Sequence, residues 1–331
     1  MWLLFVYPFE ASGVTRRDLD SPPRVDLRAD WTIGQLSRDL ERGGVIQNAT
    51  AFAAYARFLG VASALRDMQV LLHRDMRPRE VLTRIAKGYG GDKARVGFPE
   101  GFDRFDVAAR LDAAEVCDGS EFLALTEDRS VLSKLGIEGT TAEGYLFPDT
   151  YEFHLPSAPT AVLSRMVQNF RRRVRSLETE PRNESLRALG WGLPEVVTLA
   201  SIVELEARAK EEQAVIAGVF VNRMRDPAFR PKRLQADPTV SYGCRAMRPR
   251  PASCTDGRIT RAMLEDSSNR YNTYRIEGLP PGPIANPGLG ALRAAFHPAV
   301  HRYFYFVADG TGHHRFSETL SAHNDAVHGA N

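Results

Sequence analysis

Two glutamates, Glu204 and Glu206, hold the positions in the sequence that best suit acid–base chemistry. They directly follow residues 196–203, VVTLASIV, and this apolar stretch follows a Pro-Glu pair typical of the first turn of a helix. A helix that is apolar around its whole circumference is expected in the protein interior. Burial makes a carboxyl group harder to ionise and raises its pKa, which is what a general acid needs near neutral pH.

Only one of the two glutamates can face a given cleft. Residues two apart on a helix point about 200° apart, so the pair projects to nearly opposite sides. A second interpretation is that the helix reaches the surface here and that its carboxylates pair with Arg208 or Lys210. The local sequence is compatible with both interpretations.

The segments downstream of these glutamates combine polar and aromatic side chains with proline and glycine. They are residues 234–243, LQADPTVSYG, residues 271–274, YNTY, and residues 278–288, GLPPGPIANPG. Stiff turns present side chains at low entropic cost, and aromatic faces beside hydrogen-bonding groups commonly hold sugars. We therefore expect a groove that suits carbohydrate, while any single residue could instead only cap a turn. The candidates for orienting the sugar or the acid are Asn222, Gln235, Asp237, Thr239, Tyr271, Asn272 and Tyr274.

Three other polar sites have structural interpretations. Glu143, which opens the segment EGYLFPDTY, is a supporting carboxylate or a turn-stabilising residue. His297 and Pro298 are expected to end a helix. His313 and His314 lack a partner carboxylate at ligand spacing, so we expect neither a metal site nor a cofactor.

The composition is that of a globular chain with a substantial core. It has 331 residues, 43% hydrophobic and 25% charged, and 43 Lys+Arg against 41 Asp+Glu leave a net charge of +2. This charge is too small to favour a nucleic-acid partner. Cys117, Cys244 and Cys254 have no zinc spacing. The last two bracket a short loop and could form a disulfide in an oxidising compartment or remain free thiols.

The N-terminal region divides into a terminal segment and a repeated pattern. Met1 to Phe9 are apolar but far short of the ~20 residues that cross a bilayer as a helix. They are either a buried strand or the tail of a membrane anchor whose start is missing, so residues 1–29 are assigned as a truncated anchor or linker. Three times between residues 31 and 111, a short extended piece and a turn lead into a helix with apolar residues at three- and four-residue spacing, such as Leu36 and Leu40 or Leu82 and Ile85.

These small β-α units resemble LysM-like carbohydrate-binding modules, although ordinary packing units would show the same periodicity. The predicted fold is α+β, with a LysM-like region, residues 30–97, packed on a larger catalytic domain, residues 98–331, around a central buried helix.

Taken together, the C-terminal segments resemble the MltG (YceG-like) endolytic murein transglycosylases. The resemblance covers about residues 30 to 328 and keeps the family order. The matching segments are ASIVELE at 200–206, VFVNRM at 219–224, LQADPTVSYG, YNTY, GLPPGPIANPG, FYFVADG at 304–310, Phe316, and His323 with Asn324.

The resemblance implies an enzyme that cuts the MurNAc-GlcNAc bond of peptidoglycan glycan strands without water. One glutamate protonates the glycosidic oxygen and then takes the proton of the C6 hydroxyl, which leaves a 1,6-anhydro-MurNAc end. The family pattern maps this acid onto Glu206, with Glu204 as the second choice. Leu205 and Ala207 depart from the basic and hydroxyl residues that the family shows there.

The resemblance also implies surroundings and alternatives. It suggests an enzyme attached to the cytoplasmic (inner) membrane by an N-terminal anchor, with its catalytic domain facing the periplasm or cell exterior. Cell-wall synthases would be partners, and the activity would end growing strands. Two other classes stay open: a two-carboxylate hydrolase, in which Asp237 would be the partner of Glu206, and a peptidoglycan-binding scaffold without catalysis.

Overall fold

The computed structural model describes residues 24–27, 31–61, 68–72, 78–87, 93–180 and 184–328. The chain forms two compact units. One comprises Met1–Val96, Arg110–Gly119 and Tyr151–Val162, and the other comprises Gly97–Ala109, Ser120–Thr150 and Leu163–Asn331. Apart from residues 24–27, the segment assigned as anchor or linker lies outside the described residues. Within the described part of the chain, no helix is both long and apolar enough to cross a membrane.

The first unit begins with strand β1 (Arg24–Leu27), helices α3 (Ile33–Arg42) and α4 (Ala49–Phe58), strand β2 (Met68–Leu71) and helix α5 (Pro78–Lys87). The strands β1 and β2 pair antiparallel. Thr32 begins α3 in a capping box: its Oγ1 accepts from the Gln35 backbone N–H, and the Gln35 side chain accepts from the Thr32 N–H at 2.8 Å.

The helices of this unit enclose a core of their own. Its fully buried members include Leu36, Leu40, Leu82 and Ile85, at the three- and four-residue spacing seen in the sequence. The strands were expected immediately before the helices. Instead β1 ends six residues before α3 begins, and Thr32, although its backbone is extended, is the N-cap of α3 and not part of a strand.

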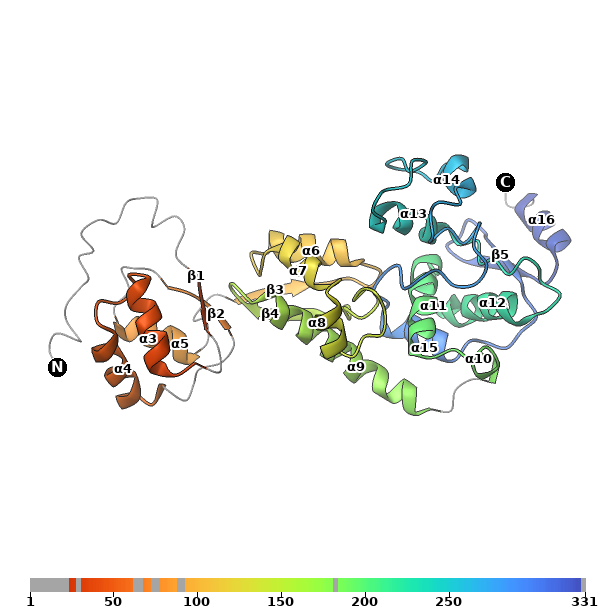
Figure 1. The fold of residues 1–331 in the computed structure, drawn as a ribbon. Helices are drawn as coiled ribbons and strands as arrows, with labels where there is room; N and C mark the ends of the chain where they lie inside the picture. The colour runs from red at the N-terminus through yellow and green to blue at the C-terminus, as the bar shows by residue number, and fades with distance from the viewer. Residues whose placement is uncertain are drawn as a thin grey trace. The chain divides into compact units, whose positions relative to one another are not determined.

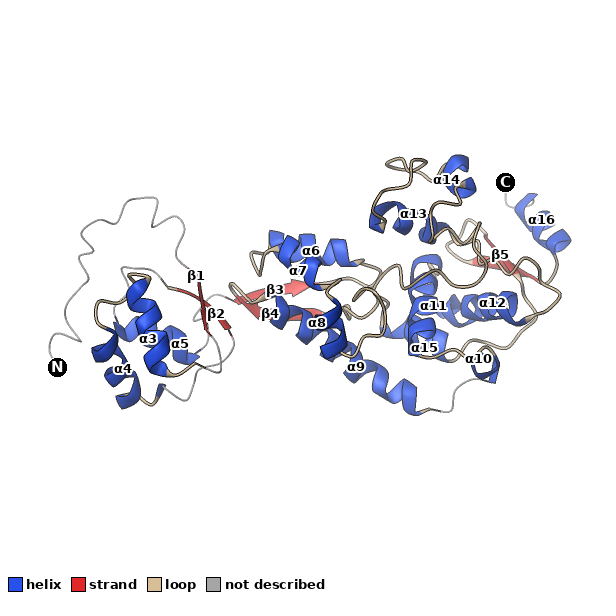
Figure 2. Ribbon diagram, viewed as in Figure 1, coloured by secondary structure: helices blue, strands red, loops and turns tan. Residues whose placement is uncertain are grey.

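The elements that follow are mostly helices, and their short strands form two-stranded sheets (Figure 2). In chain order they are β3 (Lys93–Gly97), α6 (Arg104–Ala113), α7 (Gly119–Leu125), α8 (Arg129–Lys134), β4 (Thr150–His154), α9 (Pro159–Thr179), α10 (Glu184–Ala188), α11 (Leu193–Glu206), α12 (Gln213–Arg225), α13 (Asp237–Ala246), α14 (Arg261–Glu265), α15 (Leu289–Phe296), β5 (Tyr305–Ala308), β6 (His314–Ser317) and α16 (Leu320–His328). The α+β class is confirmed.

Helix α11 is the buried central helix that its composition predicts. Every residue from Val196 to Val203 is buried, and the helix packs against α12 and α15 (Figure 1). Pro194 lies in its first turn, and the Glu195 side chain accepts a hydrogen bond from the Gly192 N–H at 2.8 Å. As expected, the helix before His297 ends there.

Two further features complete the second unit. The strands β5 and β6 form an antiparallel hairpin, and α16 packs on it. Cys244, near the end of α13, is joined to Cys254 by a disulfide, so the disulfide alternative is confirmed over free thiols. Cys117 is buried and keeps its thiol.

Candidate active site

Helix α11 ends at a cavity of about 650 Å³, and Glu206 lies on its wall. Side chains from α11, α12, α13, the β5–β6 hairpin and α16 line the rest. Burial raises the pKa of Glu206 to about 7; the nearby charge of Asp237 raises it as well, and Arg223 opposes the rise. A carboxyl with this pKa exists in both protonation states near neutral pH, so it can give a proton and take one back.

Glu204 points to a different environment and does not line this cavity. Its Oε2 accepts a hydrogen bond from the Gly288 backbone N–H at 3.0 Å, and burial raises its pKa. Lys210 pairs with Glu100 rather than with either glutamate. Among the described residues neither glutamate forms an ion pair with Arg208 or Lys210, although the charge of Lys210 lowers the pKa of Glu204 and the helix reaches the surface at Leu205.

Gln235, Asp237 and Tyr274 line the same cavity as Glu206. The Tyr274 hydroxyl donates to Asp237 Oδ1 at 2.7 Å. Gln235 has a φ of 54°, a backbone conformation that residues other than glycine rarely adopt and that costs about 1–3 kcal/mol. Such strain is typical of functional sites, where the surrounding structure holds the residue in place.

The other predicted sugar-binding residues are not on the cavity wall. Thr239 and Asn272 are fully buried. Thr239 Oγ1 donates to the Ala236 carbonyl at 2.6 Å, and Asn272 Nδ2 donates to three backbone carbonyls between residues 263 and 266. The polar groups of both residues are used to hold the segments that carry Gln235 and Tyr274.

Asn222 and Tyr271 likewise lie outside the cavity lining. Asn222 Nδ2 donates to the carbonyls of His301 at 2.9 Å and Tyr303 at 3.0 Å, so it fixes the chain that leads into β5. The Tyr271 ring packs edge-on against Tyr242 at 5.0 Å. Both residues have supporting contacts in the structure rather than contact with the cavity.

Arg223 is a site residue that sequence reasoning missed. It is buried, its Nε donates to the Phe304 carbonyl at 2.7 Å, and its Nη1 donates to the Leu234 carbonyl. The rings of Phe220, Phe229 and Tyr305 lie 5.7–5.9 Å from its guanidinium carbon. Burial lowers the pKa of Arg223 to about 10, which still leaves it charged at neutral pH.

A signal for Arg223 was present in the sequence. It stands next to an otherwise apolar stretch of α12, and a buried charge needs a specific use or partner. The cavity residues of the hairpin and α16 were not singled out as site residues, although FYFVADG and His323 belong to the segments that resemble the family. They include Tyr305, His314 and His323. Among the described residues, no group of three or more His, Cys, Asp or Glu side chains could hold a metal ion.

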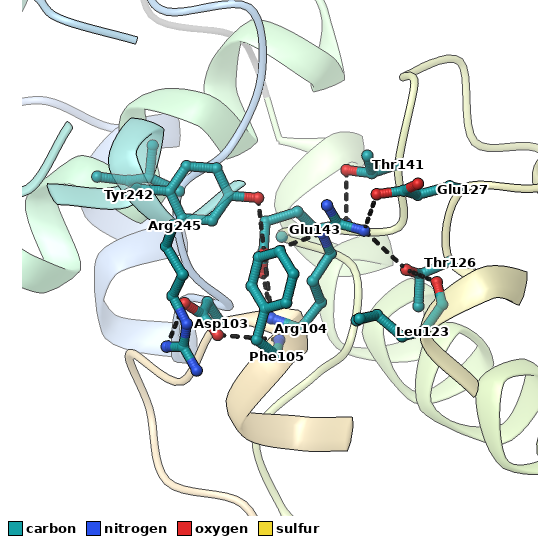
Figure 3. A network of polar contacts seen from close by, with 12 residues as sticks. Asp103, Arg104, Phe105, Leu123, Thr126, Glu127, Thr141, Glu143, Tyr242 and Arg245 are labelled. Atoms are coloured by element: carbon teal, nitrogen blue, oxygen red, sulfur yellow. Dashed lines mark hydrogen bonds and ion pairs between the residues drawn. The ribbon is translucent and has the colours of Figure 1, made fainter. Parts of the chain in front are cut away.

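Glu143 lies at the centre of a buried network beneath α13 (Figure 3). It is 0% exposed and accepts hydrogen bonds from the Arg104 backbone N–H at 3.0 Å, the Tyr242 hydroxyl at 2.9 Å and Asn286 Nδ2 at 2.9 Å. Burial raises the pKa of Glu143 to about 8. Tyr242 is on the helix that Asp237 begins, so Glu143 is a supporting carboxylate of that helix.

A second cavity, of about 410 Å³, adjoins the first. The two share the side chains of Leu205, Asp237 and Pro238, and the second continues along α13 past Ser241 to Arg245. Glu206 lines the first cavity only, whereas the preceding residue, Leu205, contributes to both. Two neighbouring cavities suit a chain-like ligand that continues past the acid.

The electrostatics of Glu206 give a prediction for Asp237. Replacing Asp237 with Asn removes a negative charge that raises the pKa of Glu206, so that pKa is expected to fall below about 7. Carbon NMR titration of side-chain-labelled glutamates in the two proteins measures it. An unchanged or higher pKa in Asp237→Asn would show that the two carboxyls do not interact.

Comparison with known proteins adds three similarities. The profile of the YceG-like family matches residues 25–329. The endolytic murein transglycosylase of Bacillus subtilis (strain 168) is 27% identical over 337 residues, 97% of this chain and 88% of that protein. The endolytic murein transglycosylase of Streptococcus pneumoniae (strain D39) is 25% identical over 305 residues, and the match spans 84% of this chain and 53% of that protein.

A solved structure is also similar. The crystal structure of a YceG-like protein from Listeria monocytogenes aligns with a TM-score of 0.58 at 27% identity, over 92% of this chain and 99% of that one.

Proposed function

The chain belongs to the YceG-like family, and we propose that it is an endolytic murein transglycosylase with Glu206 as its acid. The relatives from Bacillus and Streptococcus carry that name. The single observation that supports Glu206 is its position: it lies on the wall of the larger of two neighbouring cavities, where burial raises its pKa to about 7.

The chemistry needs one group that changes protonation state. The Glu206 carboxyl donates its proton to the glycosidic oxygen as the bond from that oxygen to C1 of MurNAc breaks. The resulting carboxylate takes the proton of the C6 hydroxyl, whose oxygen bonds to C1. The product is a 1,6-anhydro-MurNAc end, no water is consumed, and Glu206 is protonated again.

Arg223 suits the second half of this cycle. Its fixed positive charge favours the carboxylate form of Glu206. Burial has the opposite effect and is the larger of the two. The balance leaves the pKa close to the pH at which both forms are accessible, where general acid–base catalysis is most efficient.

A two-carboxylate hydrolase is the second candidate, because Asp237 lies on the same cavity wall as Glu206. In that mechanism water attacks C1 and the product has a reducing end. Digestion of purified peptidoglycan in water enriched in heavy oxygen, followed by mass spectrometry, separates the two. A transglycosylase gives anhydro ends without the label, and labelled reducing ends would overturn the proposal.

Two further assignments belong to the proposal. Residues 30–97 act as a LysM-like glycan-binding region. This is supported by the strand–helix–helix–strand order that begins with β1 at residues 24–27 and ends with β2, and by the separate core. The catalytic unit works on the outer side of the cytoplasmic membrane, held there by an N-terminal anchor, beside cell-wall synthases. The disulfide between Cys244 and Cys254 supports an oxidising compartment.

A further inference from the structure

Two arginines line the Glu206 cavity, and one of them is uncommitted. Arg208 is exposed and makes no hydrogen bond, ion pair or ring contact with any residue that the structure describes. Arg223 is fixed by the carbonyls of Phe304 and Leu234, which occupy its Nε and Nη1. No partner for its Nη2 exists in the described part of the chain. The cavity therefore offers guanidinium N–H groups to a ligand.

The adjoining cavity differs in this respect. Its arginine, Arg245, is paired with Asp103 at 2.7 Å and with Asp106 at 2.8 Å. Those two carboxylates already neutralise it, whereas the Glu206 cavity sets two arginines against Asp237 and a glutamate that is partly protonated near pH 7. An anionic group on a ligand that occupies both cavities would thus be held in the Glu206 cavity.

We propose that Arg208 and Arg223 form a carboxylate-binding subsite for the acidic substituent carried on the C3 lactyl ether of a muramyl residue. This rests on the proposed function, since it deepens the account of the same site. The two sugars of the glycan strand differ by this substituent, and the linkages along the strand alternate. A subsite that reads the carboxylate would fix the register, so that the muramyl residue and not its neighbour lies at Glu206.

The carboxylate can have two sources. In strands stripped of peptide it is the lactyl carboxylate itself, and in strands that carry stem peptides it belongs to the peptide. A planar guanidinium suits either, because its paired N–H groups match the two oxygens of a carboxylate.

Binding to inactive protein tests the subsite separately from the activity. Calorimetry compares Glu206→Gln with the double variant Glu206→Gln/Arg208→Gln, using three ligands: stem-bearing strands, peptide-stripped strands, and stripped strands whose lactyl carboxyl has been converted to a neutral amide. The Arg208 change is expected to weaken binding of carboxylate-bearing strands about fivefold and to leave the amide strands unaffected.

The ligands also identify the source. A loss confined to stem-bearing strands assigns the carboxylate to the peptide, and a loss with stripped strands assigns it to the lactyl group. Equal affinities for all three ligands, or the same loss with the neutral amide, would overturn the subsite even if the wild-type protein produces anhydro ends. Conversely, a loss of affinity that depends on the carboxylate would support the subsite even if the wild-type protein produces no anhydro ends.

Two control variants accompany this test. Arg315→Gln, in the same background, removes an equal charge from an exposed position on β6 that does not line the cavity, and it is expected to leave affinity unchanged. Arg208→Lys keeps the charge but not the paired N–H geometry, and it should lose less affinity than Arg208→Gln.

Discussion

Glu206→Gln is expected to slow the cleavage of glycan strands by about a thousandfold while leaving the fold unchanged. Glutamine has nearly the same shape but no proton to donate to the glycosidic oxygen. Because Glu206 makes no hydrogen bond or ion pair with a described residue, the substitution breaks no such contact. Mass spectrometric counting of anhydro ends over time gives the rate, and circular dichroism verifies the fold.

Glu204→Gln is the matched control for that experiment. A glutamine oxygen can still accept the hydrogen bond from the Gly288 N–H, so the loop contact survives and only a small change in rate is expected. A loss in Glu204→Gln as large as that in Glu206→Gln would mean that the second glutamate is the acid. Full activity in both variants would remove the single-glutamate mechanism.

The largest effect on stability is expected at Glu143. In Glu143→Ala the Arg104 N–H, the Tyr242 hydroxyl and Asn286 Nδ2 lose their shared acceptor in a fully buried site. Leaving buried donors without an acceptor, and opening a cavity beside them, should lower the free energy of unfolding by about 3–5 kcal/mol. Urea unfolding measures the loss. A loss below about 1 kcal/mol would contradict a supporting role for this carboxylate.

Glu143→Gln separates the charge of this group from its shape. In the folded protein the pKa of Glu143 is about 8, above the ordinary value of 4.5, so the folded state binds the proton more tightly than the unfolded state. The stability from this group is complete below pH 4.5 and is lost as the pH rises through 8. Glutamine cannot ionise, so its contribution is independent of pH.

Wild-type protein should therefore lose stability relative to Glu143→Gln between about pH 5 and pH 9. Unfolding in urea at several pH values gives the two slopes. Parallel slopes would show that the Glu143 carboxyl titrates alike in the folded and unfolded chains, and would contradict the raised pKa of Glu143 in the folded protein.

Local patterns in the sequence were sufficient for much of the fold. The apolar run before Glu204 predicted a buried helix, and α11 is that helix. The spacing of Leu36, Leu40, Leu82 and Ile85 predicted helices with an inward face. These features are local: helix geometry repeats every 3.6 residues, so composition over ten or so residues determines which face is buried. The motif order also pointed to the family that the comparisons show.

Other features depend on contacts between distant residues, and only the tertiary structure decided them. Helical geometry predicts that Glu204 and Glu206 point apart, but it does not predict which of the two faces a cavity. That depends on Gly288, 84 residues from Glu204, whose N–H donates to the Glu204 carboxylate, and on the β5–β6 hairpin, which lines the Glu206 cavity.

Contacts between distant residues also decide which residues of the downstream segments reach the cavity. Gln235, Asp237 and Tyr274 reach the cavity, whereas Thr239 and Asn272, of equal promise in the sequence, are used within the loops. The commitment of Arg223 to two carbonyls and the pairing of Cys244 with Cys254 also follow from the folded chain. The sequence by itself determined the chemistry available at the end of α11. The packing of distant segments determined which side chains share the cavity with it, because a hydrogen-bonding group that is satisfied elsewhere cannot also serve a ligand.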